Sequence, residues 1–296
     1  MQAIESVPAA PRVPDRRATR RSVLGAGCAL LACAGAADAG PGHGASGRLR
    51  EPEAAPLGLP IAAPESPRVA WVFSSGGPRG FVHVGVLKGL GAPRLEQLAL
   101  DLQPWDLLRW NPRGPEWLHG GGIAGLVNEV LGGRRLEDLP MPVASVAVRA
   151  DDGEAVAFTR GDVGLAVQAS SAIVGRLAPV RIGGVRYVDA DQRLPLPVRL
   201  ARGLGASRVL AVDASAHEDR APAAAARYRD IDLRKRALTQ PDARVADVLL
   251  HPDTGYWAGW SRAYRERLIA AGEAAVHAQA ARLAELHGGI PSARMS

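Results

Sequence analysis

Short continuous runs of apolar residues alternate along the chain with longer stretches in which apolar residues recur every three or four positions. The continuous runs are typical of buried strands, and the periodic stretches are typical of amphipathic helices. The pattern predicts strands at 69–73, 143–148, 154–159 and 209–212. It predicts helices at 81–90, 95–108, 123–131, 166–173, 196–204 and 262–286. Strands that alternate with helices predict a layered α/β domain whose central sheet is mostly parallel.

Glycine pairs mark two further boundaries. Gly132-Gly133 follows the helix predicted at 123–131, where glycine commonly ends a helix. Gly183-Gly184 separates two short apolar runs at 180–182 and 185–188, which is the signature of a β-hairpin.

The first 39 residues have the pattern of an export signal. Arg20-Arg21 precede a mildly apolar run from Ala26 to Ala37, and small residues follow. The arginine pair resembles a twin-arginine motif, and a general secretory signal is the alternative. Leu30-Leu31-Ala32-Cys33 resembles a lipoprotein box, which would make 1–32 the signal and Cys33 the lipidated residue. Cleavage after Ala39 is the other reading.

We expect three regions: the export signal at 1–39, a Gly/Pro/Ala-rich linker at 40–66, and a folded domain at 67–286. We also expect an exported, periplasmic protein, with a lipid anchor if Cys33 is modified. Both cysteines, Cys28 and Cys33, lie in the signal. The exported body would therefore have no disulfide and no cysteine metal site.

Composition and charge exclude several classes of protein. Of the 296 residues, 47% are hydrophobic and 22% charged, which is typical of a globular protein and not of a disordered one. Residues 1–50 hold seven of the 36 basic residues and three of the 30 acidic ones. The remainder is nearly neutral, so the basic character is that of a targeting segment and we expect no nucleic-acid partner.

The segment Ser75 to Gly80 is the strongest candidate for chemistry. Glycines at a strand-to-helix turn let backbone N–H groups converge on a phosphate or a developing oxyanion. A tight turn without a ligand is the alternative. A second glycine pattern at Gly120, Gly122 and Gly125 follows no predicted strand, so we interpret it as a helix start and not as a dinucleotide site. The histidines lack metal-ligand spacing, and we expect neither a metal site nor a cofactor.

Five ordered motifs resemble segments of the patatin-like phospholipases. Phe73 to Leu87 resembles that family's oxyanion segment, and Ala169 to Ile173 the stretch before its catalytic aspartate. Tyr187-Val188-Asp189, followed by Pro195 to Val198, resembles the aspartate segment. Leu204 to Val209 with Val212-Asp213, and Ala246 to Leu249 with Pro252-Asp253, resemble the segments after it. The resemblance covers roughly residues 67–280.

The resemblance implies a three-layer α/β/α fold and a Ser–Asp dyad that hydrolyses lipid esters. By position, Gly76, Gly77 and Gly80 would donate to the oxyanion, Arg79 would brace the loop, and Asp189 would be the dyad acid. The alternative for Asp189 is an ordinary turn residue at the end of the hairpin. The implied partners are a lipid or lysophospholipid ester and a membrane surface.

The chain departs from the family at the nucleophile. It contains no Gly-x-Ser-x-Gly, and no Ser, Thr or Cys lies between Gly76 and Ala144. The family's nucleophile strand, elbow and following helix are absent as one block, and Ala190 replaces a family glycine. Ser145 lies inside a predicted strand, and Ser170 and Ser171 match family residues that are not the nucleophile.

This departure leaves two hypotheses: an acyl-ester hydrolase that is inactive as written, or a non-catalytic protein that binds a lipid or a partner at the cell envelope. Both predict no ester turnover above background. A sheet without its central strand also predicts loose packing.

Overall fold

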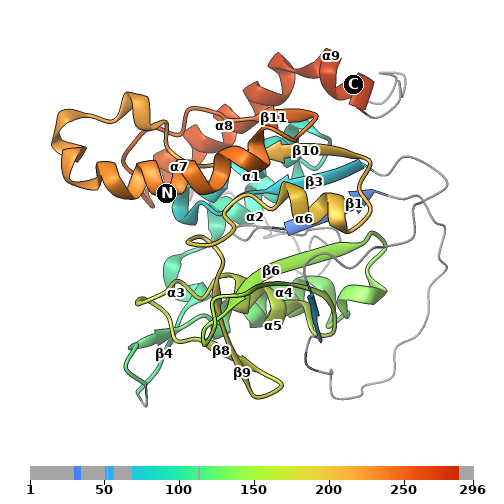
Figure 1. The fold of residues 1–296 in the computed structure, drawn as a ribbon, viewed down its shortest axis with the longest axis vertical. Coiled ribbons are helices and arrows are strands. Elements are labelled where there is room, and N and C mark those ends of the chain that lie inside the picture. Colours follow the sequence, from blue (N-terminus) through green and yellow to red (C-terminus); the bar gives the residue numbers. More distant parts are fainter. Residues whose placement is uncertain (1–29, 35–50, 52, 57–68, 113, 287–296) are drawn as a thin grey trace, which may run out of the picture.

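The computed structural model describes residues 30–34, 51, 53–56, 69–112 and 114–286. Its main sheet runs through the middle of the molecule in the order β11-β10-β3-β1-β6-β7-β2, with β9 on β6 and β8 on β9 (Figure 1). The strands are β1 (Leu30–Ala34), β2 (Glu53–Pro56), β3 (Val69–Phe73), β6 (Val143–Arg149), β7 (Ala155–Arg160), β8 (Val180–Ile182), β9 (Val185–Asp189), β10 (Arg208–Val212) and β11 (Val248–Leu250). A separate small hairpin consists of β4 (Arg109–Trp110) and β5 (Leu118–His119).

Helices connect and cover these strands. They are α1 (Phe81–Gly89), α2 (Arg94–Asp101), α3 (Pro104–Leu107), α4 (Gly121–Leu131), α5 (Val163–Ser170), α6 (Val198–Gly203), α7 (Arg229–Ala243), α8 (Arg262–Ala278) and α9 (Ala280–Leu286). Short 3₁₀ turns are η2 (Gly77–Gly80), η3 (Leu136–Asp138), η4 (Glu218–Arg220) and η5 (Ala223–Tyr228). In the described part of the chain, no helix combines the length and the apolar character that crossing a bilayer requires.

Six of the nine described strands of the main sheet run in one direction, β2 and β8 among them because they pair antiparallel with the reversed strands β7 and β9. β3, β10 and β11 pair in parallel. β1 pairs antiparallel with both β3 and β6, so β6 has the same direction as β3. β7 and β9 pair antiparallel with β6 and are reversed. The α/β class is confirmed, and among the described strands parallel hydrogen bonding is confined to β3, β10 and β11.

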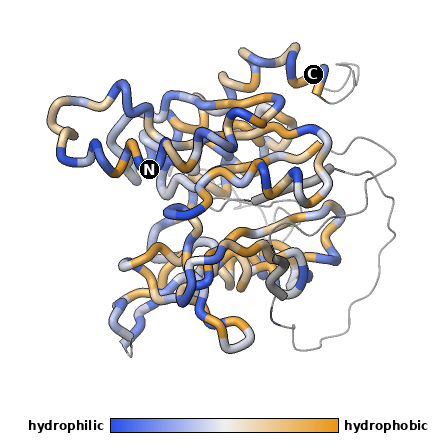
Figure 2. The backbone as a smooth tube through the Cα atoms, viewed as in Figure 1, coloured by the Kyte–Doolittle hydropathy of each residue, from blue (hydrophilic) through white to orange (hydrophobic). Residues whose placement is uncertain are grey.

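The sheet is covered on both faces, which confirms the three-layer architecture. Successive residues of a strand point to opposite faces. Ala70 and Val72 of β3 therefore pack with α6 on one face, whereas Val69 and Phe73 pack with α1 on the other. On this second face α1 and α8 cover β3, β10 and β11, and α4 and α5 cover β6 and β7. Figure 2 shows hydrophobic residues along the central strands.

Two glycines allow α1 and α8 to cross closely. A Cβ on Gly85 of α1 would lie 1.9 Å from the carbonyl oxygen of Ile269, and one on Gly272 of α8 would lie 2.1 Å from that of Val82. These distances are far below van der Waals contact. The helix pair therefore requires glycine at both positions.

The single helix predicted at 95–108 is wrong, because the structure divides it into α2 and α3. Leu102 and Gln103 have extended backbone between the two helices. Pro104 lacks an N–H and disfavours helical backbone at the residue before it. The proline thus ends the first helix and begins the second.

The pattern of apolar residues did not predict α7 or β11. Hydrophilic residues cover much of α7 (Figure 2), and its Ile231 and Leu233 are exposed. It also contains Pro241 in its interior. Such a helix has no apolar stripe of the kind that predicts helices from sequence.

The sequence predicted a sheet without its central strand, and the middle of the sheet lies between β3 and β6. β1 lies there, with Leu31 opposite both Val72 of β3 and Ala144 of β6. β1 comes from the predicted export signal, and β2 comes from the predicted linker and pairs with β7. The other residues of 1–66, apart from residue 51, lie outside the described residues, including the arginine pair and the cleavage site after Ala39.

Candidate functional site

The glycine loop follows β3 at the end of the sheet. The Ser74 N–H donates to the Val212 carbonyl of β10 at 3.0 Å, and the Ser75 N–H donates to the Pro195 carbonyl at 2.8 Å. Gly77 has a φ of +51°, a left-handed conformation that favours glycine. A Cβ on Gly76 would lie 2.9 Å from the Cβ of Ala214. The glycines at positions 76 and 77 and the hydrogen bonds to Val212 and Pro195 therefore fix the conformation of this loop.

Two backbone donors of the loop remain available. Among the described residues, the N–H groups of Gly76 and Gly77 have no hydrogen-bond acceptor. The Arg79 guanidinium donates to the Tyr256 carbonyl and ties the loop to the segment before α8. Free backbone N–H groups in a glycine turn are suited to hold a negatively charged oxygen.

His83 supports the loop from behind. The residue is buried, and its Nε2 donates to the Ser74 carbonyl at 2.9 Å. Burial lowers the pKa of His83 to about 4, so the ring is neutral at pH 7. We assign His83 a structural role, because its Nε2 is occupied by the hydrogen bond to the Ser74 carbonyl.

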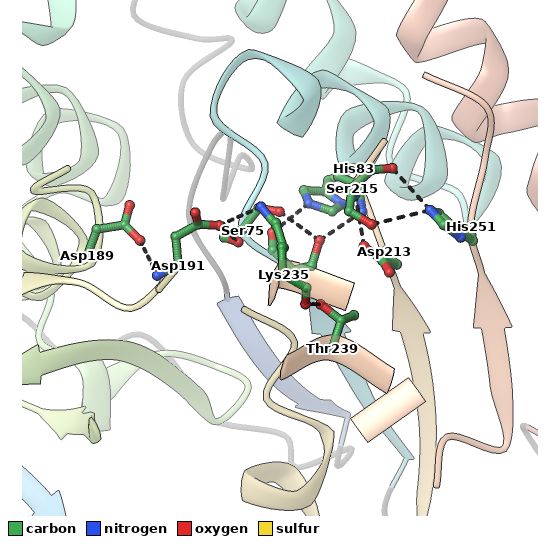
Figure 3. Close-up of polar contacts among 11 residues, drawn as sticks. Ser75, His83, Asp189, Asp191, Asp213, Ser215, Lys235, Thr239 and His251 are labelled. Atoms are coloured by element: carbon green, nitrogen blue, oxygen red, sulfur yellow. Dashed lines mark hydrogen bonds and ion pairs between the residues drawn. The ribbon is translucent and has the colours of Figure 1, made fainter. Parts of the chain in front are cut away.

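The predicted dyad acid, Asp189, is the last residue of β9 and lies at the same end of the sheet. Its backbone N–H donates to the Ala172 carbonyl at 2.9 Å. Its Oδ1 accepts the N–H of Asp191 at 2.7 Å (Figure 3). In the described hydrogen bonds no hydroxyl donates to the Asp189 carboxylate, so the structure does not complete a dyad with it.

A second carboxylate contacts a serine instead. The Ser75 hydroxyl donates to Asp191 Oδ1, and Lys235 Nζ of α7 lies 2.6 Å from the same oxygen (Figure 3). The sequence patterns indicated no role for Asp191 or Lys235, and none for Ser75 beyond the loop. Ser75 is 116 positions from Asp191 in the sequence, and Lys235 is 44 positions from it. Only the fold brings the three side chains together.

The two carboxylates have opposite pKa shifts. Burial raises the pKa of Asp189 to about 6, and the nearby charge of Asp191 adds to this effect. Burial would also raise the pKa of Asp191, but the charge and hydrogen bond of Lys235 and the hydrogen bond of Ser75 hold it below its ordinary value. At neutral pH, Asp191 is therefore ionised and accepts the hydrogen bond from the Ser75 hydroxyl.

A cavity of about 660 Å³ opens in front of the loop. It lies between the helices that cover the two halves of the sheet, and α4 lines one wall with Ile123, Leu126, Val127 and Val130. Ser75, Asp189, Asp191 and Lys235 also line it. A mostly apolar cavity with polar groups gathered in one region is the usual form of a small-molecule site.

Three other serines, Ser74, Ser145 and Ser171, use their hydroxyls in hydrogen bonds to the backbone. Ser74, 3% exposed, donates to the Ser75 carbonyl and accepts the Ala214 N–H. Ser145 is buried in β6 and donates to the Ala166 carbonyl at 3.0 Å. Ser171 lines the cavity but donates to the Val167 carbonyl at 2.8 Å.

A more polar cavity of about 420 Å³ lies next to the first, and Arg79 and Lys235 line both. Its wall includes His217 and His251, whose rings stack with centroids 3.9 Å apart. The two cavities thus present an apolar and a polar environment on either side of the same two cations.

An aromatic surface lies beside the mouth of the apolar cavity. Trp105 of α3 and Trp117 are each 70% exposed, and Trp110 of β4 is 61% exposed. The cavity-lining residue Leu118 of β5 accepts the Ala178 N–H at 2.9 Å. This bond places the hairpin next to the segment that carries exposed Ile173, another lining residue. Apolar side chains therefore continue from the cavity to the protein surface.

No protein-family model matches the chain. The chain is similar to uncharacterized NTE family proteins of Mycobacterium bovis and of two strains of Mycobacterium tuberculosis, with 30% identity to each over 193 residues. The match covers 55% of this chain and 54% of each relative, so the chain spans about half the length of these curated relatives.

Proposed function

We propose that the chain binds a lipid acyl ester, with the acyl chain in the apolar cavity and the ester carbonyl at the Gly76–Gly77 donors. The observation that carries this proposal is the position of the free N–H groups and two carboxylates on the wall of one apolar cavity. An acyl chain gains free energy by leaving water, at roughly 0.8 kcal/mol per CH₂ group. The carbonyl oxygen gains two backbone donors.

The relatives support the same class of ligand. The NTE family is a family of patatin-like phospholipase domains, and the sequence motifs resemble that group independently. Membership of the relatives in this family supports a lipid ester as the class of ligand. Within that class we propose a phospholipid or a lysophospholipid. Because the relatives are matched over only half of their length, we transfer this class of ligand and no individual activity.

The aromatic surface favours a membrane as the source of the lipid. Tryptophan combines an apolar ring with an N–H donor and is enriched at membrane–water interfaces. Trp105, Trp110 and Trp117 lie beside the cavity, so a lipid entering from a bilayer would pass along apolar side chains. The envelope location expected from the export signal is compatible with this surface, and we retain it as part of the proposal.

A fatty-acid binding assay tests the cavity. We expect the full chain to bind a fluorescent fatty acid, and Leu126→Gln on the cavity wall to weaken binding about tenfold, since about 1.4 kcal/mol corresponds to that factor. Leu233→Gln, an exposed position on α7 outside the cavity, is the control. Absence of binding by the unmodified chain would overturn the proposal.

Vesicle sedimentation tests the aromatic surface. We expect Trp110→Ala to lower the bound fraction on phosphatidylcholine vesicles, because it removes an exposed ring that packs against Trp117 with centroids 5.8 Å apart. Trp257→Ala is the control, because it removes another exposed tryptophan ring that does not line the cavity. Equal loss of binding in the two variants would contradict a specific membrane surface at the hairpin.

A further inference from the structure

Building on the proposed lipid-ester ligand, we propose that Ser75 is a nucleophile, with Asp191 as its proton acceptor and the N–H groups of Gly76 and Gly77 as oxyanion donors. This trio would replace the dyad whose elbow serine the chain lacks. It assigns catalytic roles to Ser75 and Asp191, and a positioning role to Lys235.

The first observation is the hydrogen bond between Ser75 and Asp191. A serine attacks an ester only when a base takes its proton, so the hydroxyl must point at a base before substrate arrives. The Ser75 hydroxyl donates to Asp191 Oδ1, whereas the hydroxyls of Ser74 and Ser171 donate to backbone carbonyls. Ser75 also lines the cavity that the proposed ester would enter.

The second observation is the place of Ser75 in the loop. In serine hydrolases with a nucleophile elbow, the N–H of the residue after the serine is one of the oxyanion donors. Here Gly76 follows Ser75 directly, and its N–H has no acceptor among the described residues. The close approach of Gly76 to Ala214 and the positive φ of Gly77 fix the conformation of the loop. Because both residues are glycines, no side chain of theirs covers the two N–H groups.

The third observation is how Asp191 is held. Its backbone N–H donates to Asp189 Oδ1 at 2.7 Å, and its side chain accepts Lys235 Nζ at 2.6 Å. The first contact fixes the backbone of Asp191, and the second holds its carboxylate and lowers its pKa. In this arrangement Asp189 orients Asp191 through the backbone and is not the base.

The reaction balances with water as the only co-reactant. Ser75 Oγ forms a bond to the acyl carbon while its proton moves to Asp191. The tetrahedral oxyanion then collapses, the bond to the leaving alkoxide breaks, and Asp191 returns the proton to give the alcohol. Water attacks the acyl-serine with its proton passing to Asp191, and the serine leaves with that proton. The products are a fatty acid and an alcohol.

The test is covalent labelling of the full chain with a fluorophosphonate, followed by peptide mass mapping. We expect one adduct, on Ser75. It should be absent in Ser75→Ala and retained in Ser215→Ala, a serine in the neighbouring polar cavity. Asp191→Asn should slow labelling by about 100-fold, within the range of general-base effects. Ser75→Cys keeps the side-chain size and should transfer labelling from the fluorophosphonate to iodoacetamide at position 75.

Two outcomes would overturn the assignment of Ser75 and leave the proposed function in place: fatty-acid binding with no adduct on any serine, or an adduct on another serine. Absence of fatty-acid binding would overturn the proposed function itself. A role of Lys235 in holding Asp191 is tested by the pH profile of labelling. Lys235→Met should shift the acidic limb of that profile to higher pH, which a purely structural role would not do.

Discussion

The two halves of the sheet are held together in different ways. In the half formed by β3, β10 and β11, strands pair in parallel and are joined through helices, above all by the close crossing of α1 and α8. In the half formed by β6, β7, β8 and β9, neighbouring strands pair antiparallel, and β6–β7 and β8–β9 are local hairpins. The first half therefore depends on long-range packing, and the second on contacts between residues close in sequence.

The candidate site takes one part from each half. The glycine loop with Ser75 follows β3, whereas Asp189 ends β9 and Asp191 lies just after it. The hydrogen bond from Ser75 to Asp191 and the bond from the Ser75 N–H to Pro195 are direct links between them. The proposed chemistry therefore depends on the relative position of the two halves and not on either alone.

The largest effect should come from filling the helix crossing of the parallel half. Gly85→Ala places a Cβ against the carbonyl of Ile269, and we expect a loss of about 3 kcal/mol or more in the free energy of unfolding. Gly125→Ala in α4 is the matched control, because a Cβ there meets nothing within 4 Å. It should stabilise the protein by about 0.5–1 kcal/mol. Urea unfolding measures both, and similar values for the two would contradict the role of the crossing.

A smaller effect, of opposite sign, should follow from Asp189→Asn in the antiparallel half. The folded pKa of about 6 lies above the ordinary 3.8, so folding favours the protonated carboxyl. The unmodified chain should therefore lose stability as pH rises from about 4 to above 6. The asparagine avoids this loss while its carbonyl still accepts the Asp191 N–H. We expect a gain of about 1–3 kcal/mol at pH 7 and none below pH 4. Thermal unfolding at a series of pH values measures it, and a constant difference would contradict the assignment.

The smallest effect should come from Lys235→Met, which removes the cation beside Asp191. The pair is partly exposed, so the expected loss in stability at pH 7 is about 1 kcal/mol or less, and it should shrink as pH falls and Asp191 is protonated. Lys88→Met is the matched control, because Lys88 pairs with Glu96 and Glu273 entirely within the parallel half. Both variants should have similar urea midpoints, and only Lys235→Met should change fluorophosphonate labelling. A change in labelling by Lys88→Met would show that the site does not depend on the Asp191 pair.

Most strands and several helices could be predicted because their signals are local. β3 and β10 are continuous apolar runs, and the Gly183-Gly184 turn has the positive φ values of +55° and +84° that a tight hairpin needs. The break before Pro104 was also predictable from the proline itself. Helix α7 was not, because exposed polar residues dominate its surface and its packing is not encoded as an apolar stripe.

The candidate site was only partly predictable for a different reason. The glycine loop and Asp189 belong to motifs of adjacent residues, so the sequence indicates them directly. The contact between Ser75 and Asp191 joins two loops, and Lys235 reaches them from a helix that the pattern did not indicate. No local signal distinguishes Asp191 from Asp189. Only the turn after β9 decides which carboxylate points at the serine.

Strand β1 coincides with the segment at which the expected lipoprotein signal would end. Its five residues include the peptide bond between Ala32 and Cys33, where a lipoprotein signal would be cut. Proteases bind their substrates as extended segments, and β1 already has a hydrogen-bonded neighbour on each side. A chain that folds first protects this bond, and a chain that is cut first must close its sheet without the strand. If the chain were processed as a lipoprotein, cleavage and folding would compete for the same segment, and whichever acted first would decide which sheet the protein has.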